Sequence, residues 1–216
     1  MCDRAPTVPV CNSRSVSDPN ISEPNGATSS GKPIDLLAHI VHSRRTSLVV
    51  DADAAVPDEL VDRLLDLAIW APNHKRSWPW RFAVFTGDGR RRLGEAMAAA
   101  AEKAGRSHKK VDKIRAKYLR SPVVVVVGSV ADDDPRRHAE DRDAVAAAVQ
   151  NMLLGATALG LASHWASIDE VVAPAVRSLC GVGPSDDLVA LIYLGWPTGE
   201  VAVPDRPAPE VRRIDS

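Results

Sequence analysis

The sequence predicts an α+β fold, a sandwich in which helices cover a central sheet. Residues 122–130, PVVVVVGSV, form a β-branched run without alternation, which is typical of a strand buried on both faces. Residues 141–161 form a helical stretch that is apolar nearly all round and rich in Ala and Gly. Helices come first along the chain, strands and helices then mix, and no G-x-G-x-x-G follows a strand. This order argues against a Rossmann unit and favours the α+β sandwich.

The first half of the chain is expected to supply two amphipathic helices and a strand. One helix with an apolar stripe begins at Pro33. A second begins after Pro57, where a proline and an acidic residue suit a helix N-terminus. It ends before Pro72, because the residue preceding a proline avoids the helical region. A strand over residues 81–86 follows, and a turn over residues 87–89 closes it.

The second half contains the buried helix and two further strands. Residues 90–117 are expected to be helical but uneven, because glycines weaken the middle. In a chain of this length, full burial of the helix at 141–161 suggests that another subunit covers one of its faces. The remaining expectations are a solvated loop at 132–137, strands at 162–167 and 187–194, a turn at 181–184 and an extended C-terminal segment at 201–216.

Composition limits the classes of function. The chain has 216 residues, of which 45% are hydrophobic and 25% charged, and its formal net charge is -1. Such a balance argues against a general nucleic-acid binder, which usually carries a basic excess, and against a polybasic membrane-surface protein. Cys2, Cys11 and Cys180 have neither zinc-site nor disulfide spacing, so no metal site is expected and a reducing, cytoplasmic location fits best.

The N-terminal stretch differs in composition from the rest. Residues 1–33 are rich in Pro, Ser and Asn and have no apolar period, so we expect a disordered tail. Residues 34–216 are then a single domain. No signal-peptide apolar region and no run of about 20 apolar residues occur, so no membrane span is expected.

Three segments could carry chemistry, each with a structural alternative. Arg44, Arg45 and Thr46 follow the first helix, and their guanidinium and hydroxyl groups could bind a phosphate. Taken alone, the segment is better explained as a helix C-terminus, where the dipole favours Arg. Small residues in GLASHWAS, residues 160–167, allow a ligand to approach the backbone closely. Trp165 in that segment either lines the same cavity or belongs to the core.

The third segment, residues 70–80, places three of the five tryptophans and one histidine in a proline-bounded loop. Aromatic rings beside cations suit a flat, anionic ligand, and such loops are where ligand contacts concentrate. For Trp80 the preferred interpretation is that it seals the core at the start of a strand. His74 has no carboxylate or thiol neighbour in the sequence, so no nucleophile–base pair is predicted, and we assign no catalytic residue.

From about Ile34 to Ile214 the chain resembles the flavin-dependent nitroreductase family, in particular its short, minimal bacterial branch. Four motifs in the family's order carry the resemblance, although each is weak alone. They are Arg44-Arg45-Thr46, the A-P-x-H…P-W-R-F loop at 71–82, the small-residue helix leading to G-L-x-x-x-W-x-S at 160–167, and Tyr193-Leu194-Gly195-Trp196-Pro197.

The resemblance implies a mixed, mainly antiparallel sheet flanked by helices, in an intertwined homodimer with FMN at the subunit interface. It implies that Arg44, Arg45 and Thr46 hold the FMN phosphate and ribityl chain, that Trp165, Ala166 and Ser167 lie beside the isoalloxazine, and that a late basic residue, Arg206, meets the phosphate, with Arg212 and Arg213 as alternatives. The partner's A-P-x-H loop would reach the same flavin, which implicates Trp70, Pro72 and His74.

The implied activity is an FMN-dependent oxidoreductase in which NAD(P)H reduces the flavin and a small-molecule acceptor, such as a nitroaromatic or quinone, is reduced in turn. The cofactor would supply most of the chemistry. Related sequences often carry Arg where Ala166 stands, Gln where Trp78 stands and a further Arg where Val49 stands. These departures keep open a non-catalytic flavin-binding protein that sequesters FMN. A flavin enzyme of different chemistry is a second alternative, because the family also includes flavin-fragmenting and dehydrogenating members.

Overall fold

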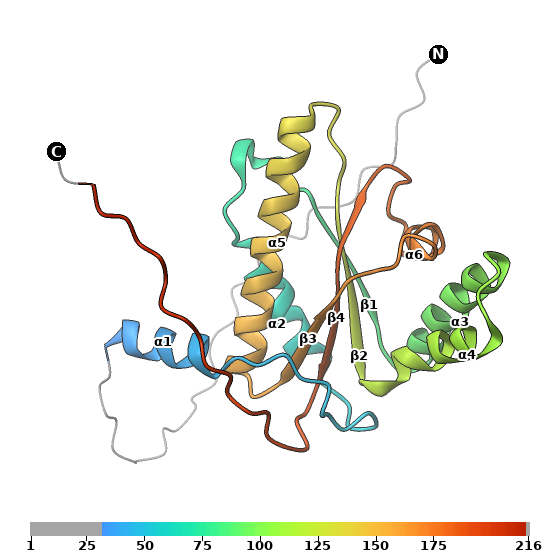
Figure 1. Ribbon diagram of the computed structural model, residues 1–216, viewed down its shortest axis with the longest axis horizontal. Helices are drawn as coiled ribbons and strands as arrows, with labels where there is room; N and C mark the ends of the chain where they lie inside the picture. Colours follow the sequence, from blue (N-terminus) through green and yellow to red (C-terminus); the bar gives the residue numbers. More distant parts are fainter. Residues whose placement is uncertain (1–31, 215–216) are drawn as a thin grey trace, which may run out of the picture.

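A computed structural model describes residues 32–214 of the chain, and Figure 1 shows a central sheet between two groups of helices. The four strands are β1 (Trp80–Phe85), β2 (Val123–Ser129), β3 (Ala162–Ala166) and β4 (Asp187–Gly195). Their order in the sheet is β1-β2-β4-β3, and all neighbours are antiparallel. The only parallel pairing within the described residues is an isolated bridge between Thr46 and Ser163. The α+β sandwich predicted from the sequence is therefore confirmed.

The valine run forms the central strand β2. Its five valines are all buried, and they alternate between the two faces of the sheet as strand geometry requires. Val123, Val125 and Val127 pack with the helices of one layer, whereas Val124 and Val126 pack with those of the other. An unbroken apolar run is what a strand covered on both faces needs, so the prediction for this segment is confirmed.

Helices α2 (Asp58–Ile69) and α5 (Pro135–Ala158) form the first layer. Leu64 and Ala68 of α2 are fully buried against α5 and the sheet. Within one chain, α5 is not buried all round: Gln150 is exposed, and Ala147 and Leu154 are only half-buried. No element of the described part of the chain covers that stripe, so its burial by a second subunit stays a prediction.

The second layer contains α3 (Gly87–Lys103), α4 (His108–Lys117) and α6 (Ala173–Cys180). Three sequence expectations are corrected here. Residues 87–89 are the first turn of α3 and not a separate turn, and residues 90–117 are divided between two helices. Helix α6 was not predicted. Its eight residues are short for a recognisable period, although Pro174 and the left-handed Gly181 mark its ends.

The expected loop at 132–137 is also corrected. The Asp134 side chain accepts a hydrogen bond from the Arg136 backbone N–H at 2.9 Å, and Pro135 follows at the first helical position. This N-cap begins α5 six residues before the predicted start.

Helix α1 (Pro33–Ser43) begins where the sequence indicates. The predicted disordered tail, residues 1–33, lies outside the described residues except for Lys32 and Pro33, and Pro33 already belongs to α1. At the other end, residues 200–214 have no regular structure and are exposed throughout, as Figure 1 shows for the segment leading to the C-terminus. Among the described residues, no helix combines the length and the apolarity needed to cross a membrane.

Candidate functional site

A cavity of about 640 Å³ is lined by three of the arginines that the sequence analysis selected. Arg44 and Arg45 follow α1, and Arg206 comes from the C-terminal segment. Gln150 of α5 also lines this space, which we call the arginine cavity. Within residues 32–214, no carboxylate lies within salt-bridge distance of these three arginines. Asp205 also lines the cavity, and against its one carboxylate the three arginines leave the net positive charge that an anion such as a phosphate requires.

The Arg45 guanidinium is held by backbone groups. Its Nη1 donates to the carbonyl oxygen of Arg44 at 2.8 Å and to that of His42. Its Nε is buried and has no hydrogen-bond partner within the described chain. A buried donor without a partner costs free energy, so a ligand that accepts from Arg45 would relieve it.

Thr46 connects the arginine segment to the edge strand β3. It forms the parallel bridge with Ser163, and the backbone N–H of Ser47 donates to the Ser163 carbonyl at 2.9 Å. The Ser163 hydroxyl is buried and has no partner in residues 32–214. The first motif thus lies directly beside the strand that carries Trp165 and Ala166.

The end of β3 presents its residues to different surroundings. Trp165 pairs in register with Ile192 of β4. Its side chain is 38% exposed, so it does not belong to the core. Ala166 packs on the other face, against the layer of α3, α4 and α6. Ser167 is exposed and lines a second cavity. These three consecutive residues therefore lie at the surface, against the core of the second layer and at a cavity, respectively. The alternation of side chains along the strand determines this placement.

The second cavity, of about 670 Å³, contains basic side chains that the sequence analysis did not select. Lys110, Lys113 and Lys117 of α4 line it together with Arg120, and we call it the lysine cavity. Burial, the Arg120 guanidinium and the Lys113 ammonium lower the pKa of Lys117. Burial, the Lys117 ammonium and the Arg120 guanidinium also lower the pKa of His164 on β3. Positive charge therefore accumulates at this end of the sheet.

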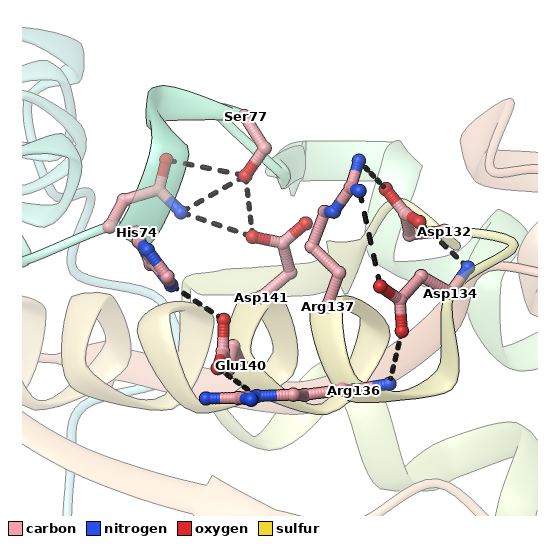
Figure 2. Close-up of polar contacts among 9 residues, drawn as sticks. His74, Ser77, Asp132, Asp134, Arg136, Arg137, Glu140 and Asp141 are labelled. Atoms are coloured by element: carbon pink, nitrogen blue, oxygen red, sulfur yellow. Dashed lines mark hydrogen bonds and ion pairs between the residues drawn. The ribbon is translucent and has the colours of Figure 1, made fainter.

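The loop with Trp70, Pro72 and His74 lies elsewhere in the chain. Trp70, at the end of α2, is 78% exposed, and Pro72 is also exposed. His74 Nδ1 lies 2.7 Å from Glu140 Oε2, near the N-terminus of α5 (Figure 2). Gln150 of the arginine cavity follows ten residues later, which is roughly 15 Å along a helix. A single chain does not bring this loop to the arginine cavity.

Asp141 of α5 anchors the same loop through hydrogen bonds. It is 3% exposed and accepts hydrogen bonds from Asn73 Nδ2 at 3.1 Å and from the Ser77 hydroxyl (Figure 2). These contacts hold a strained backbone, because Lys75, Arg76 and Trp78 all have positive φ angles. The sequence indicated the loop but not its anchor, which comes from a helix more than sixty residues away.

The two tryptophans at the end of this loop differ in burial. Trp80 packs against the core at the start of β1, as predicted, whereas Trp78 is 54% exposed. Hydrogen bonds from His74 and Arg136 lower the pKa of Glu140. No group of three or more potential metal ligands occurs in the described part of the chain.

Comparisons with known proteins agree on one family. A family model described as the Nitroreductase family matches residues 41–196. YdjA of Escherichia coli K12, which is named as an NAD(P)H nitroreductase, is 31% identical over 185 residues, covering 82% of this chain and 98% of YdjA. A nitroreductase-like family protein from Bacillus cereus has a TM-score of 0.70 at 26% identity, with 88% of this chain and 95% of that chain covered.

A structure described as a nitroreductase from Desulfovibrio desulfuricans, in complex with FMN, has a TM-score of 0.61 at 27% identity and covers 82% of this chain and 94% of its own. The family match contains all four strands, α5 and the Arg44-Arg45-Thr46 segment. The chain therefore belongs to the nitroreductase family.

Proposed function

We propose that this protein is an FMN-dependent oxidoreductase that takes hydride from NAD(P)H and passes electrons to a nitroaromatic, quinone or similar acceptor in a ping-pong sequence. The observation that carries the proposal is the arginine cavity. Arg44, Arg45 and Arg206 come from two ends of the chain, line one space and have no carboxylate partner in residues 32–214. The relatives named as NAD(P)H nitroreductases and the FMN-bound structure support the choice of cofactors.

The residues of this chain fit FMN. The three arginines would hold its phosphate, and Thr46 would bind beside them. From Ser163, which pairs with Thr46, to Ser167 the strand rises by roughly 13 Å at about 3.3 Å per residue. Trp165, Ala166 and Ser167 would then lie along the ring system. The unpartnered Nε of Arg45, which lines the arginine cavity, supports a polar ligand in this place.

When bound, FMN supplies the redox chemistry by accepting hydride and donating electrons onward. The chain positions the ligands and provides electrostatic stabilisation. The arginines fix one end, and the strand next to Trp165 limits the approach of a substrate to the other. No side chain is required as a general acid or base, which agrees with the absence of an assigned catalytic residue in the sequence analysis.

A homodimer would complete the site. Trp70, Pro72 and His74 are exposed on a loop that a single chain keeps away from the arginine cavity, so in the proposal they reach the flavin of a second copy. The half-buried stripe of α5 around Ala147 and Leu154 supports this assembly. Exposed apolar side chains support it as well, namely Ile34, Leu36 and Leu37 on α1 and Val203, Val211 and Ile214 in the C-terminal segment.

A flavin-sequestering protein is the second candidate, and one observation favours it. Ala166 and Val49 supply no charge to the ring end of the site, so stabilisation of negative charge on the flavin depends on other residues. A flavin enzyme of different chemistry is open for the same reason.

Spectroscopy of the purified full chain separates these functions. A yellow protein whose flavin absorbance bleaches with NADPH or NADH, and recovers with a nitroaromatic, supports the oxidoreductase. Bound flavin that neither nucleotide reduces supports sequestration. A colourless protein that cannot be loaded with FMN contradicts both.

A further inference from the structure

The lysine cavity has more positive charge than its surroundings neutralise. It is lined by Lys110, Lys113, Lys117 and Arg120, and its one carboxylate, Asp169, lies 3.5 Å from Arg106 Nη2. Among residues 32–214, no carboxylate lies within salt-bridge distance of the four lining cations. Cations on low-dielectric walls concentrate the field and raise the local concentration of anions.

Helical spacing explains why the lysines act together. Positions 110, 113 and 117 are separated by three and four residues, so their side chains emerge on one face of α4. Arg120 follows in the short helical turn η2 (Tyr118–Arg120), where its Nε donates to the Lys117 carbonyl at 3.1 Å. That bond keeps the two cationic residues adjacent. An anion between them would offset the desolvation and repulsion that lower the pKa of Lys117.

The rest of the lining is apolar and aromatic. Met97, Tyr118 and Val172 are almost completely buried, and Ile114 is half-buried. The volume of about 670 Å³ lies within the range of roughly 300–1,000 Å³ that small-molecule sites occupy. A cavity with cationic side chains beside an apolar wall suits a compact ring that carries a negative group.

The position of the cavity connects it to the redox site. Ser167 lines it, and Ser167 directly follows the strand assigned to the ring end of the cofactor. We propose that the lysine cavity binds the electron acceptor and selects aromatic carboxylates, with Lys113, Lys117 and Arg120 receiving the carboxylate. This inference rests on the proposed function, because only that function makes a ligand at Ser167 an acceptor.

Two acceptors that differ in charge test the selection. 4-Nitrobenzoate and 4-nitrobenzamide share a nitro-substituted ring, so the cavity should give the carboxylate the lower KM, and added salt should reduce the difference. In Lys117→Met, the KM for 4-nitrobenzoate should rise about tenfold more than the KM for 4-nitrobenzamide, as expected for loss of one charged contact. Lys109→Met is the matched control, since Lys109 is an exposed lysine of α4 that does not line the cavity.

Equal KM changes for the two acceptors, or the same preference change in Lys109→Met, would overturn the inference. A change confined to FMN affinity in Lys117→Met would also overturn it and assign the cations to the cofactor.

Calorimetry with 4-nitrobenzoate on the protein as purified separates this inference from the proposed function. Binding that weakens about tenfold in Lys117→Met and not in Lys109→Met supports the anion site even if NAD(P)H oxidation is absent, an outcome that contradicts the proposed function alone. Absence of binding overturns the inference while leaving flavin reduction as an independent result.

Discussion

Gly94 of α3 faces the backbone carbonyl of Arg115 on α4, and the two helices touch there without a side chain between them. A Cβ added at Gly94 would come much closer to that oxygen than the sum of their van der Waals radii. The obstacle is backbone rather than the end of a flexible side chain, so α4 would have to move. Since α4 carries the lysines of the lysine cavity, this contact sets how closely the lysine-bearing helix approaches α3.

Gly94→Ala should therefore destabilise the fold by about 1–3 kcal/mol, because overpacking forces backbone shifts. Urea unfolding measures the change. Gly89→Ala, in the first turn of the same helix, is the matched control, since its Cβ would meet Phe85 at an ordinary 3.7 Å. That control should be neutral or slightly stabilising, as expected for alanine in a helix. Equal effects at both positions would contradict the proposed clash.

The anchor of the 73–78 loop offers a second comparison. Asp141→Ala should lower the free energy of unfolding by about 1–3 kcal/mol, because Asn73 and Ser77 lose a buried acceptor. Glu140→Gln should change it little, since the ion pair with His74 is exposed to solvent. Denaturant titrations of both variants give the answer. An Asp141→Ala protein as stable as the parent would show that the loop does not depend on its anchor.

The phosphate assignment is tested by removing one guanidinium. Arg44→Ala should weaken FMN binding by about 10- to 100-fold, which corresponds to the 1.5–3 kcal/mol of a charged hydrogen bond. Flavin fluorescence during equilibrium dialysis measures the affinity. Arg63→Ala on the exposed face of α2 is the control and should retain the parental affinity. An unchanged dissociation constant in Arg44→Ala would refute the assignment.

Mixing two variants tests whether each site is shared between subunits. If Arg44 and His74 of different copies serve one flavin, a heterodimer of Arg44→Ala and His74→Ala has one doubly altered and one intact site. Random exchange of subunits should then restore roughly a quarter of the sites to parental affinity. Recovery is read from bound flavin after co-refolding. No recovery above the mean of the two separate variants would contradict a shared site.

Cys180 provides a pH-dependent measurement. Burial raises the pKa of its thiol from 9.0 to about 11, so at pH 8 the folded protein should hold about 100-fold less thiolate than an ordinary cysteine. Alkylation by iodoacetamide, followed peptide by peptide, should be correspondingly slow and should accelerate toward pH 11. The stability that the neutral thiol contributes is complete below about pH 9 and is lost as the pH rises through about 11.

Protein unfolded in urea is the control for Cys180, and there the rate should match that of a free thiol. Rapid labelling of the folded protein at pH 8 would show that the thiol is not protected.

The sequence predicted the parts of the fold whose signals are local. The valine run specified β2 because five consecutive buried β-branched residues have few alternatives to a central strand. The prediction from the sequence was wrong at 87–89, where Gly-Asp-Gly has strong turn propensity yet forms the first turn of α3. It was also wrong at 132–137, where an acidic run followed by two arginines suggests a loop and conceals a capped helix start at Asp134. At 132–137 the missed signal was local, because Asp134 is an N-cap and Pro135 stands at the first helical position.

The candidate site was accessible to different degrees. The assignment of Arg44 and Arg206 to one site came from resemblance to a family, because local sequence patterns do not relate positions so far apart in the chain. The lysine cavity was missed, although Lys110, Lys113 and Lys117 have a helical spacing that could have indicated one face of α4. Its apolar wall could not be found in this way, since Met97 and Val172 join it only through tertiary packing.

The C-terminal segment has a kinetic consequence. Residues 200–214 form no regular structure, yet Arg206 within them lines the arginine cavity. In the proposed function Arg206 holds the FMN phosphate, and a guanidinium on such a segment can withdraw from it while the sheet and its helices remain in place. The residence time of the cofactor should then depend on how often residues 200–214 detach. Truncation before Arg206 should accelerate flavin dissociation more than it slows association.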